Sequence, residues 1–190
     1  MSNSGFLIVV TAPSGSGKTT IYREVLAKNR DLVFSVSYTT RKKRPSEIQG
    51  RDYYFIEKEQ FERMTAHGEF IEWAVVHGEL KGTERAQVER YLEEKRVCIL
   101  DVDVQGALNI MKEYPDAVTI FIEPPSIVEL ERRLRKRKTE SEKQILVRLR
   151  DAENELAYRN RFKYIVVNDI AEKAIQEVEQ IITQERKTRS

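Results

Sequence analysis

The residues at positions 12–19 have the types and the spacing that phosphate binding requires, because they read Ala-Pro-Ser-Gly-Ser-Gly-Lys-Thr. In the pattern G-x-x-x-x-G-K-[ST], backbone N–H groups wrap a phosphate, the lysine reaches the β- and γ-phosphates, and the last hydroxyl binds Mg²⁺. Ala12 stands where the pattern has glycine, which is tolerated if the backbone there does not need a positive φ. The candidate triphosphate-binding residues are Ala12, Pro13, Ser14, Gly15, Ser16, Gly17, Lys18, Thr19 and Thr20.

An acid at the end of a neighbouring strand is the second requirement of such a site. The apolar run 97–100 ends in Asp101, a carboxylate that can act on magnesium through a water molecule. Asp103 follows two residues later and, on the strand period, points the same way. Burying both carboxylates for folding alone costs more than either contributes, so we interpret the pair as functional. Thr19 and Asp101 are the candidate metal ligands, and the sequence leaves open which of the two acids is nearer the metal.

A basic loop supplies candidate ligands for a second phosphate. Arg41 and Arg44 stand three residues apart, and Tyr53 follows. Arginine forks bind a doubly charged phosphate better than lysine does, and a tyrosine hydroxyl can complete the cage. A solvated basic loop, or one that contacts nucleic acid nonspecifically, remains the alternative at this point.

The elements that must position these groups alternate between apolar and amphipathic runs. Strands rich in β-branched residues are predicted at Phe6–Val10, Val97–Val102, Val118–Ile122 and Tyr164–Val167. Helices are predicted at Thr19–Lys28, Glu84–Lys95, Glu142–Leu156 and from about Ala171, with Ser141 as an N-cap. This order predicts an α/β fold with a parallel sheet flanked by helices.

The stretch 34–82 has a different texture. Short β-like pieces at Phe34–Tyr38, Tyr53–Ile56 and Phe70–Val76 are separated by charged turns, with a helix expected at Glu59–His67. We therefore expect a core formed by residues 1–33 and 83–190, interrupted by a small, mostly β insertion at 34–82.

Composition narrows the function classes without naming one. The 190 residues suit one domain, and 33 Lys plus Arg against 31 Asp plus Glu do not favour a dedicated nucleic-acid binder. Cys98, the single cysteine, lies in an apolar run and is expected to be a core residue. The run 6–10 is too short to span a bilayer and carries no signal-peptide features, so we expect a cytoplasmic protein without a membrane partner.

Several separated motifs together resemble the guanylate kinase family. They are SVSYTTR with RPSE and GRDYYF from Ser35, GEFIEWA at Gly68–Ala74, ILDVDVQG at Ile99–Gly106, PPS at Pro124–Ser126 and IVVND at Ile165–Asp169. Because the motifs keep the family's order, the resemblance covers nearly the whole chain. It implies a P-loop NTPase fold in which the insertion binds a nucleoside monophosphate and a helical lid lies at about 132–148, around the basic run Arg132–Lys138.

The activity that the resemblance implies is transfer of the ATP γ-phosphate to GMP or dGMP, with Mg²⁺, in purine nucleotide metabolism. The residues implied to bind GMP are Ser37, Arg41, Arg44, Tyr53, Glu72, Lys81, Thr83 and Asp103. Those implied in catalysis are Lys18, Arg41, Arg133, Arg137 and Arg148. Asn168 matches a residue that contacts the ATP nucleotide, although capping of the next helix would also explain it. No general base is needed, because the acceptor is an ionised phosphate oxygen.

Guanine offers a physical reason for the carboxylate at Glu72, since its N1–H and 2-amino group are adjacent donors, whereas adenine has an acceptor at N1. Lys81 departs from the family pattern, because a second phosphate-binding tyrosine is expected there. Its ammonium is expected to replace the tyrosine hydroxyl as a point charge.

Two other functions are alternatives to a kinase that acts on ATP and GMP. A kinase of a phosphorylated sugar would not need Ser37, Glu72 and Asp103 together. A non-catalytic interaction module typically loses the phosphate loop, which is intact here. As partners we expect the two nucleotides and no nucleic acid, in a monomer or homodimer.

Overall fold

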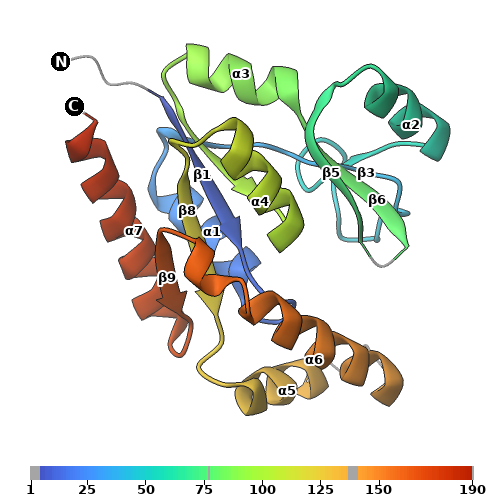
Figure 1. The fold of residues 1–190 in the computed structure, drawn as a ribbon, viewed down its shortest axis with the longest axis vertical. Helices are drawn as coiled ribbons and strands as arrows, with labels where there is room; N and C mark the ends of the chain where they lie inside the picture. The colour runs from blue at the N-terminus through green and yellow to red at the C-terminus, as the bar shows by residue number, and fades with distance from the viewer. Residues whose placement is uncertain (1–4, 77, 137–140, 190) are drawn as a thin grey trace.

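The chain forms two β-sheets, one larger and parallel and one smaller and mixed (Figure 1). The structure is a computed structural model that describes residues 5–76, 78–136 and 141–189. In the larger sheet the order is β2-β7-β1-β8-β9, and all neighbours are parallel. Its strands are β1 (Phe6–Thr11), β2 (Leu32–Phe34), β7 (Val97–Asp101), β8 (Val118–Glu123) and β9 (Tyr164–Val167). The four strands predicted for this sheet are confirmed, and β2 is an additional edge strand.

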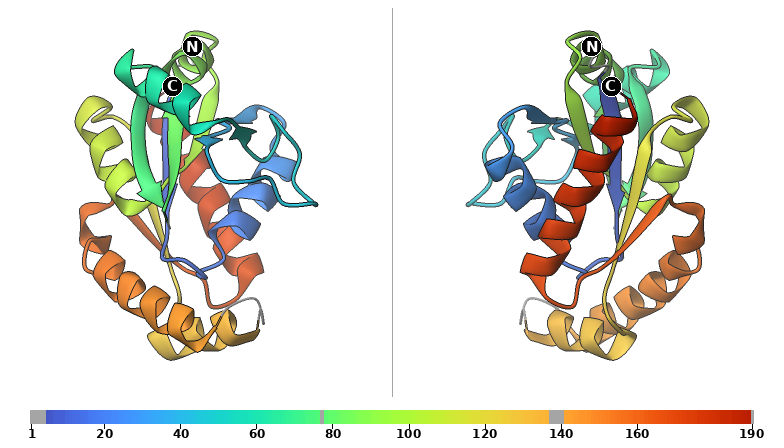
Figure 2. Two further views of the ribbon diagram at one scale, coloured as in Figure 1. Left: turned by 90° about the vertical axis from the view of Figure 1, so that its right-hand side faces the viewer. Right: turned by 90° about the vertical axis from the view of Figure 1, so that its left-hand side faces the viewer.

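Helices cover both faces of the parallel sheet, which explains why its strands are apolar without alternation. The covering helices are α1 (Lys18–Lys28), α3 (Arg85–Glu93), α4 (Val104–Glu113) and α7 (Ala171–Thr188). On β1, Ile8 and Val10 belong to the core cluster that includes α1 and α7, while Leu7 and Val9 belong to the cluster that includes α3 and α4. Figure 2 shows the sheet between α4 and the pair α1 and α7. Cys98 is fully buried in the second cluster, as predicted.

The smaller sheet forms a separate lobe with its own core. Its strands are β3 (Tyr38–Thr39), β4 (Tyr54–Phe55), β5 (Phe70–Val76) and β6 (Glu79–Glu84), and they lie in the order β4-β3-β6-β5. The lobe also contains the helix α2 (Lys58–Ala66). Phe61 of α2 stacks on Phe70 of β5 with ring centroids 4.4 Å apart. A Cβ at Gly82 would lie 3.0 Å from both rings, so the hairpin packs closely only with glycine there. The residues 40–53 between β3 and β4 are called the basic loop below.

The strand predicted at Phe34–Tyr38 is wrong. Phe34 ends β2 in the parallel sheet and Tyr38 begins β3 in the small sheet, so the residues between them connect the two. Gln87 of α3 holds this connection, because its Oε1 accepts hydrogen bonds from Ser35 Oγ at 2.7 Å and from the Val36 N–H at 2.8 Å. The buried Gln87 side chain thus supplements the backbone hydrogen bonds of the junction, in which the Ser35 N–H donates to the Ile99 carbonyl and the Ser37 carbonyl accepts from the Tyr54 N–H.

Two further helices, α5 (Ile127–Lys136) and α6 (Glu142–Leu156), pack on each other through Leu130, Leu134 and Ala152. They lie on the same side of the parallel sheet as the small lobe, at its other end (Figure 1). Ser141 caps α6 as predicted, in a capping box with Gln144. A 3₁₀ turn at Arg159–Arg161 precedes β9. Among the helices of the described ranges, none is long and apolar enough to cross a membrane.

Candidate active site

The phosphate loop lies between the end of β1 and the start of α1. Gly15 and Gly17 have φ angles of +98° and +88°, which residues with a side chain adopt only at a cost. Ala12 has no positive φ, since Lys95 is the one non-glycine residue with such an angle in the described chain. The departure from the glycine pattern at Ala12 is therefore compatible with the loop.

Asn168, directly after β9, fixes the loop from outside. Its Nδ2 donates to the Ser16 carbonyl at 2.6 Å, and its backbone N–H donates to the Glu123 carbonyl at 2.8 Å. A Cβ at Gly17 would clash with this amide, so the close contact requires glycine. The N-cap of α7 is Ile170, which removes the alternative of helix capping by Asn168.

Lys18 and Asp101 form an ion pair at the base of the loop, with 2.5 Å between Nζ and Oδ1. Lys18 also donates to the Val102 carbonyl at 2.8 Å. The parallel pairing of β7 with β1 sets Asp101 opposite Val10, where β1 enters the loop. Burial by itself raises the pKa of Asp101, but Lys18 and Lys81 bring that pKa below its usual value. Asp101 therefore stays ionised.

Asp103 has a structural role, the capping of a helix, which the interpretation of the sequence did not include. Its carboxylate accepts the backbone N–H of Gly106 at 2.7 Å and caps α4. Because β7 ends at Asp101, the strand period does not extend to Asp103. The interpretation that the two carboxylates serve function alone is wrong for Asp103, although both residues line the same cavity.

Two neighbouring cavities, of about 710 and 570 Å³, open beside the phosphate loop. The larger is lined by the loop itself, and the smaller by Arg41 and Arg44 of the basic loop. Tyr53, Lys81 and Arg148 line both cavities, so the two adjoin. The structure thus brings together the phosphate loop and the second set of anion ligands predicted from the sequence.

Lys81 sits at the junction of the two cavities. Its Nζ donates to the Asp101 carbonyl at 2.9 Å and lies 5.6 Å from the centroid of the Tyr53 ring. Burial by itself lowers the pKa of this ammonium, but Asp101, Tyr53 and Glu72 raise it above its ordinary value. Lys81 is therefore a permanent positive charge beside both cavities.

Glu72 of β5 is a buried carboxylate with one side-chain partner, the Thr83 hydroxyl, which donates to Oε1 at 2.5 Å. A Cβ at Gly106 would lie 2.6 Å from Oε2, so the first turn of α4 packs directly on the carboxylate. Burial raises the pKa of Glu72 to about 6. Ser37 and Thr83 are also buried, and with Glu72 they lie outside the lining of the two cavities.

The arginines predicted for the lid have different surroundings. Arg148 of α6 donates from Nη1 to the Ser14 hydroxyl at 2.9 Å and so links this helix to the phosphate loop. Arg133 of α5 instead donates to Glu129 at 2.8 Å and to the Asp169 carbonyl at 3.4 Å, away from both cavities. Arg137 lies outside the described residues.

The sequence interpretation missed the acids that α6 contributes. Asp151 and Glu155 line the larger cavity, and burial raises the pKa of Glu155 to about 7. Their spacing from Arg148, at i+3 and i+7, is a signal that the helical period could have provided. Glu47, which contacts the basic loop arginines, was also missed, because only the folded loop brings it near them.

The oxygen donors at the larger cavity suit a magnesium ion. The described residues hold no group of three or more His, Cys, Asp or Glu side chains that would form a protein cage for a metal. Thr19 and Asp101 both line the cavity, one with a hydroxyl and one with a carboxylate. Mg²⁺ typically takes one or two protein oxygens together with water and substrate phosphates, so these residues fit it.

Comparison with known proteins gives a consistent result. The sequence profile of the guanylate kinase family matches residues 4–185. The chain is 49% identical to a guanylate kinase of Thermotoga maritima, over 96% of this chain and 88% of the relative. It is 44% identical to one of Carboxydothermus hydrogenoformans, over 97% and 90%. It also resembles the crystal structure of guanylate kinase from Anaplasma phagocytophilum, with a TM-score of 0.81, 31% identity, and coverage of 98% and 88%.

Proposed function

Because this chain belongs to the guanylate kinase family, we propose that its two joined cavities are the donor and acceptor halves of the phosphotransfer site. The family, the α/β fold and the ATP:GMP phosphotransferase activity predicted from the motifs are confirmed. The alternatives of a sugar-phosphate kinase and of a non-catalytic module are thereby removed.

On the donor side, the phosphate loop holds the ATP phosphates. The N–H groups at the start of α1 face the anion, and Lys18 exchanges Asp101 for the β- and γ-phosphates. The Asp101 carboxylate keeps a positive charge near it in that exchange, because Lys81, which donates to the Asp101 backbone carbonyl, also lowers the pKa of the carboxyl group. Thr19 and, through water, Asp101 would hold Mg²⁺, which offsets the negative charge of the phosphates.

On the acceptor side, Arg41, Arg44, Tyr53 and Lys81 hold the GMP phosphate. The single observation that carries this assignment is their convergence on one cavity that shares Tyr53, Lys81 and Arg148 with the phosphate-loop cavity. Two polyanions repel each other, so a site that joins them needs this excess of positive charge. Arg148 serves both halves from α6.

Guanine is recognised by the buried Glu72 of the small lobe and the half-buried Asp103 of the core. Glu72 accepts from the guanine N1–H and 2-amino groups, with Ser37, Thr83 and Asp103 beside it. A carboxylate with so few protein donors binds a ligand with two donors well and leaves adenine unpaired.

The reaction itself needs positioning and charge rather than proton transfer. An ionised oxygen of GMP attacks the γ-phosphorus, the bond from that phosphorus to the bridging oxygen of the β-phosphate breaks, and ADP leaves with the electron pair. The loop, Lys18 and the arginines stabilise the charge that spreads over the transferred group. Approach of the small lobe and of the helix pair α5 and α6 excludes water that would hydrolyse ATP. Arg133 and Arg137 join the site in this closed state in the proposal.

The remaining assignments follow from the substrates. ATP and GMP are the proposed partners, the expectation of a monomer or homodimer stays a prediction, and a cytoplasmic location fits the pool of both nucleotides.

Steady-state rates with GMP, dGMP, AMP and UMP, measured by coupled ADP release, test the site. Arg41→Ala should raise the KM for GMP by about tenfold or more, because a charge-assisted pair is lost, and leave the KM for ATP nearly unchanged. An equal rise in both constants, or in neither, would place the acceptor phosphate elsewhere.

A further inference from the structure

Glu47, in the middle of the basic loop, contacts both arginines of the acceptor site. Its carboxylate accepts from Arg41 Nη2 at 2.7 Å and Nη1 at 3.1 Å, and from the backbone N–H of Arg44 at 2.8 Å. The side chain is only 14% exposed. The Arg41 hydrogen bonds hold the pKa of Glu47 below its usual value, so this carboxylate is ionised at neutral pH.

The contacts of Arg41 leave one edge of its guanidinium available. Glu47 occupies the edge formed by Nη1 and Nη2, and Nη1 also donates to the Lys42 carbonyl at 2.8 Å. The rings of Tyr53 and Phe55 lie 5.5 and 5.6 Å from the guanidinium carbon. Within the described chain no hydrogen bond uses Nε, so the Nε–Nη2 edge remains for a bidentate contact with a phosphate.

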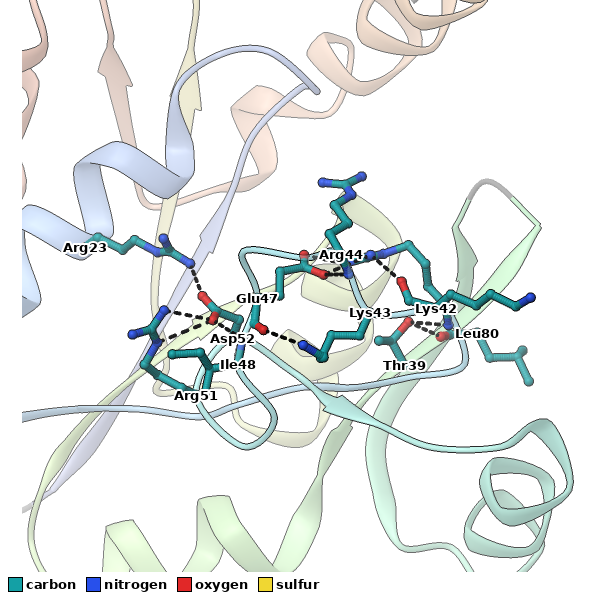
Figure 3. Close-up of polar contacts among 11 residues, drawn as sticks. Arg23, Thr39, Lys42, Lys43, Arg44, Glu47, Ile48, Arg51, Asp52 and Leu80 are labelled. Carbon is teal, nitrogen blue, oxygen red and sulfur yellow. Dashed lines mark hydrogen bonds and ion pairs between the residues drawn. The ribbon is translucent and has the colours of Figure 1, made fainter. Parts of the chain in front are cut away.

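Arg44 is fixed through its backbone rather than its side chain. The Glu47 N–H donates to the Arg44 carbonyl at 3.1 Å, which closes a turn, and Lys43 Nζ donates to the Glu47 carbonyl at 3.0 Å. Figure 3 shows the result, with Glu47 against the loop backbone and the Arg44 guanidinium directed away from the loop. That guanidinium lines the smaller cavity.

We propose that Glu47 is a positioning residue of the acceptor site, which clamps the Nη1–Nη2 edge of Arg41 and the turn at Arg44 so that both guanidiniums present their remaining donors to the GMP phosphate. The inference rests on the proposed function of Arg41 and Arg44. Glu47 does not touch GMP in this scheme, and the phosphate does not displace it, because the two anions use different edges of Arg41. A long arginine side chain loses rotational freedom when it binds, and a clamp removes most of that loss before GMP arrives.

Charge alone predicts the opposite, that the Glu47 carboxylate weakens GMP binding, since it offsets one positive charge near the phosphate. The two effects predict opposite signs. If orientation dominates, loss of the carboxylate weakens GMP binding; if charge dominates, it strengthens it.

The test compares Glu47→Gln with Glu62→Gln, a control that removes a carboxylate of the same lobe which is 58% exposed and pairs with Lys58. Glutamine keeps the size of Glu47 but cannot hold both guanidinium nitrogens as an anion. We expect Glu47→Gln to raise the KM for GMP about tenfold, with kcat at saturation and the KM for ATP within about twofold of the parent. Glu47→Asp, which keeps the charge with a shorter reach, should recover part of the loss.

An unchanged or lowered KM for GMP in a folded Glu47→Gln protein would overturn the inference. A melting temperature equal to that of Glu62→Gln shows that the lobe is folded, and if Glu47→Gln melts early, Glu47→Asp carries the same comparison. The double variant Arg41→Ala/Glu47→Gln should lose less than the product of the single losses, because Glu47 acts through Arg41. If Arg41→Ala itself leaves the KM for GMP unchanged, the proposed acceptor site fails; if only Glu47→Gln does, the clamp alone fails.

Discussion

At the scale of single residues, the acceptor half depends on one carboxylate whose charge is easily lost. Burial raises the pKa of Glu72 to about 6, while the Thr83 hydroxyl and Lys81 lower it and Asp103 and Asp101 raise it further. A protonated Glu72 carries a hydrogen where guanine N1–H must donate. GMP recognition should therefore fail in the mildly acidic range.

We expect the KM for GMP to rise as the pH falls through about 6, whereas the KM for ATP stays nearly constant. Part of the rise comes from GMP itself, because phosphate monoesters take up a proton with a pKa of about 6. Glu72→Gln removes the share that belongs to the enzyme and should flatten the profile and relax discrimination against AMP. A profile identical in both proteins would mean that guanine is read elsewhere.

The pH dependence that Glu72 gives to the free energy of unfolding has the opposite sign to the pH dependence it gives to GMP binding. Because the pKa of Glu72 is raised from 4.5 in the unfolded chain, its stabilising contribution is present below pH 4.5 and is lost as the pH rises through about 6. Glu72 thus costs some stability at the pH where it recognises guanine.

Lys81 offers a second residue-scale prediction. Lys81→Ala removes a charge that serves both Asp101 and the acceptor cavity. We expect it to raise the KM for GMP by about tenfold, the size of one charge-assisted hydrogen bond, while Lys81→Tyr restores much of the binding. If neither variant differs from the parent in the KM for GMP, Lys81 lies outside the site.

At the scale of elements, the turn after β9 holds the phosphate loop through Asn168. Asn168→Ala leaves the buried Ser16 carbonyl without its donor, which should lower the free energy of unfolding by about 1–3 kcal/mol. The KM for ATP should rise with it, because the loop loses its anchor. Asn160→Ala, at an exposed position of the 3₁₀ turn, is the control. Thermal melts and ATP kinetics measure both, and an Asn168→Ala protein with a parental KM for ATP would contradict the anchoring role.

Elements with one continuous signal were predictable from the sequence. β1, β7 and β8 are apolar runs because both faces of the sheet are buried there, β9 is an apolar run at the sheet edge although Ile165 and Val167 are exposed, and α6 starts at its capping Ser141. β2 has only three residues in the sheet, too short a run to separate from the connection to β3 that follows. Asp103 is the N-cap of α4. Its carboxylate can serve as a metal ligand or as a helix cap, and the sequence alone does not separate the two roles.

The candidate site was predictable as far as its motifs reach. The phosphate loop and the arginines of the basic loop are local patterns, and the fold brings them to adjoining cavities. The contacts of Arg148 with Ser14 and of Arg133 with the Asp169 carbonyl join distant parts of the chain, and no local pattern contains that information.

At the scale of the whole molecule, two contacts tie the outer parts, the small lobe and the helix pair α5 and α6, to the core. Arg23 of α1 reaches Asp52 of the basic loop at 2.7 Å, as Figure 3 shows, and Arg148 reaches Ser14 from α6. Both bridge an outer part to the helix or loop that holds ATP. In the proposed mechanism, the outer parts close further on the core when the nucleotides supply further charge.

Small-angle scattering should detect this closure as a smaller radius of gyration with GMP and an unreactive ATP analogue than with neither. Either nucleotide alone should produce a smaller change, since each side of the site has its own ligand. Superimposable profiles in all four conditions would mean that the protein is already closed or does not close.

Because Cys98 is buried in β7, the rate at which its thiol reacts can report how often the core opens. Burial raises the pKa of this thiol to about 12, so the reactive thiolate is scarce and shielded while the sheet is intact. A thiol reagent can modify Cys98 only when the packing of α3 and α4 on this face of the sheet opens, and the labelling rate then measures how often that happens. Because Asp101 ends the strand that contains Cys98, nucleotides bound at the carboxyl edge of the sheet should slow the labelling of the thiol. The labelling rate of Cys98 would then report whether the nucleotide site is occupied, although the thiol itself does not touch that site.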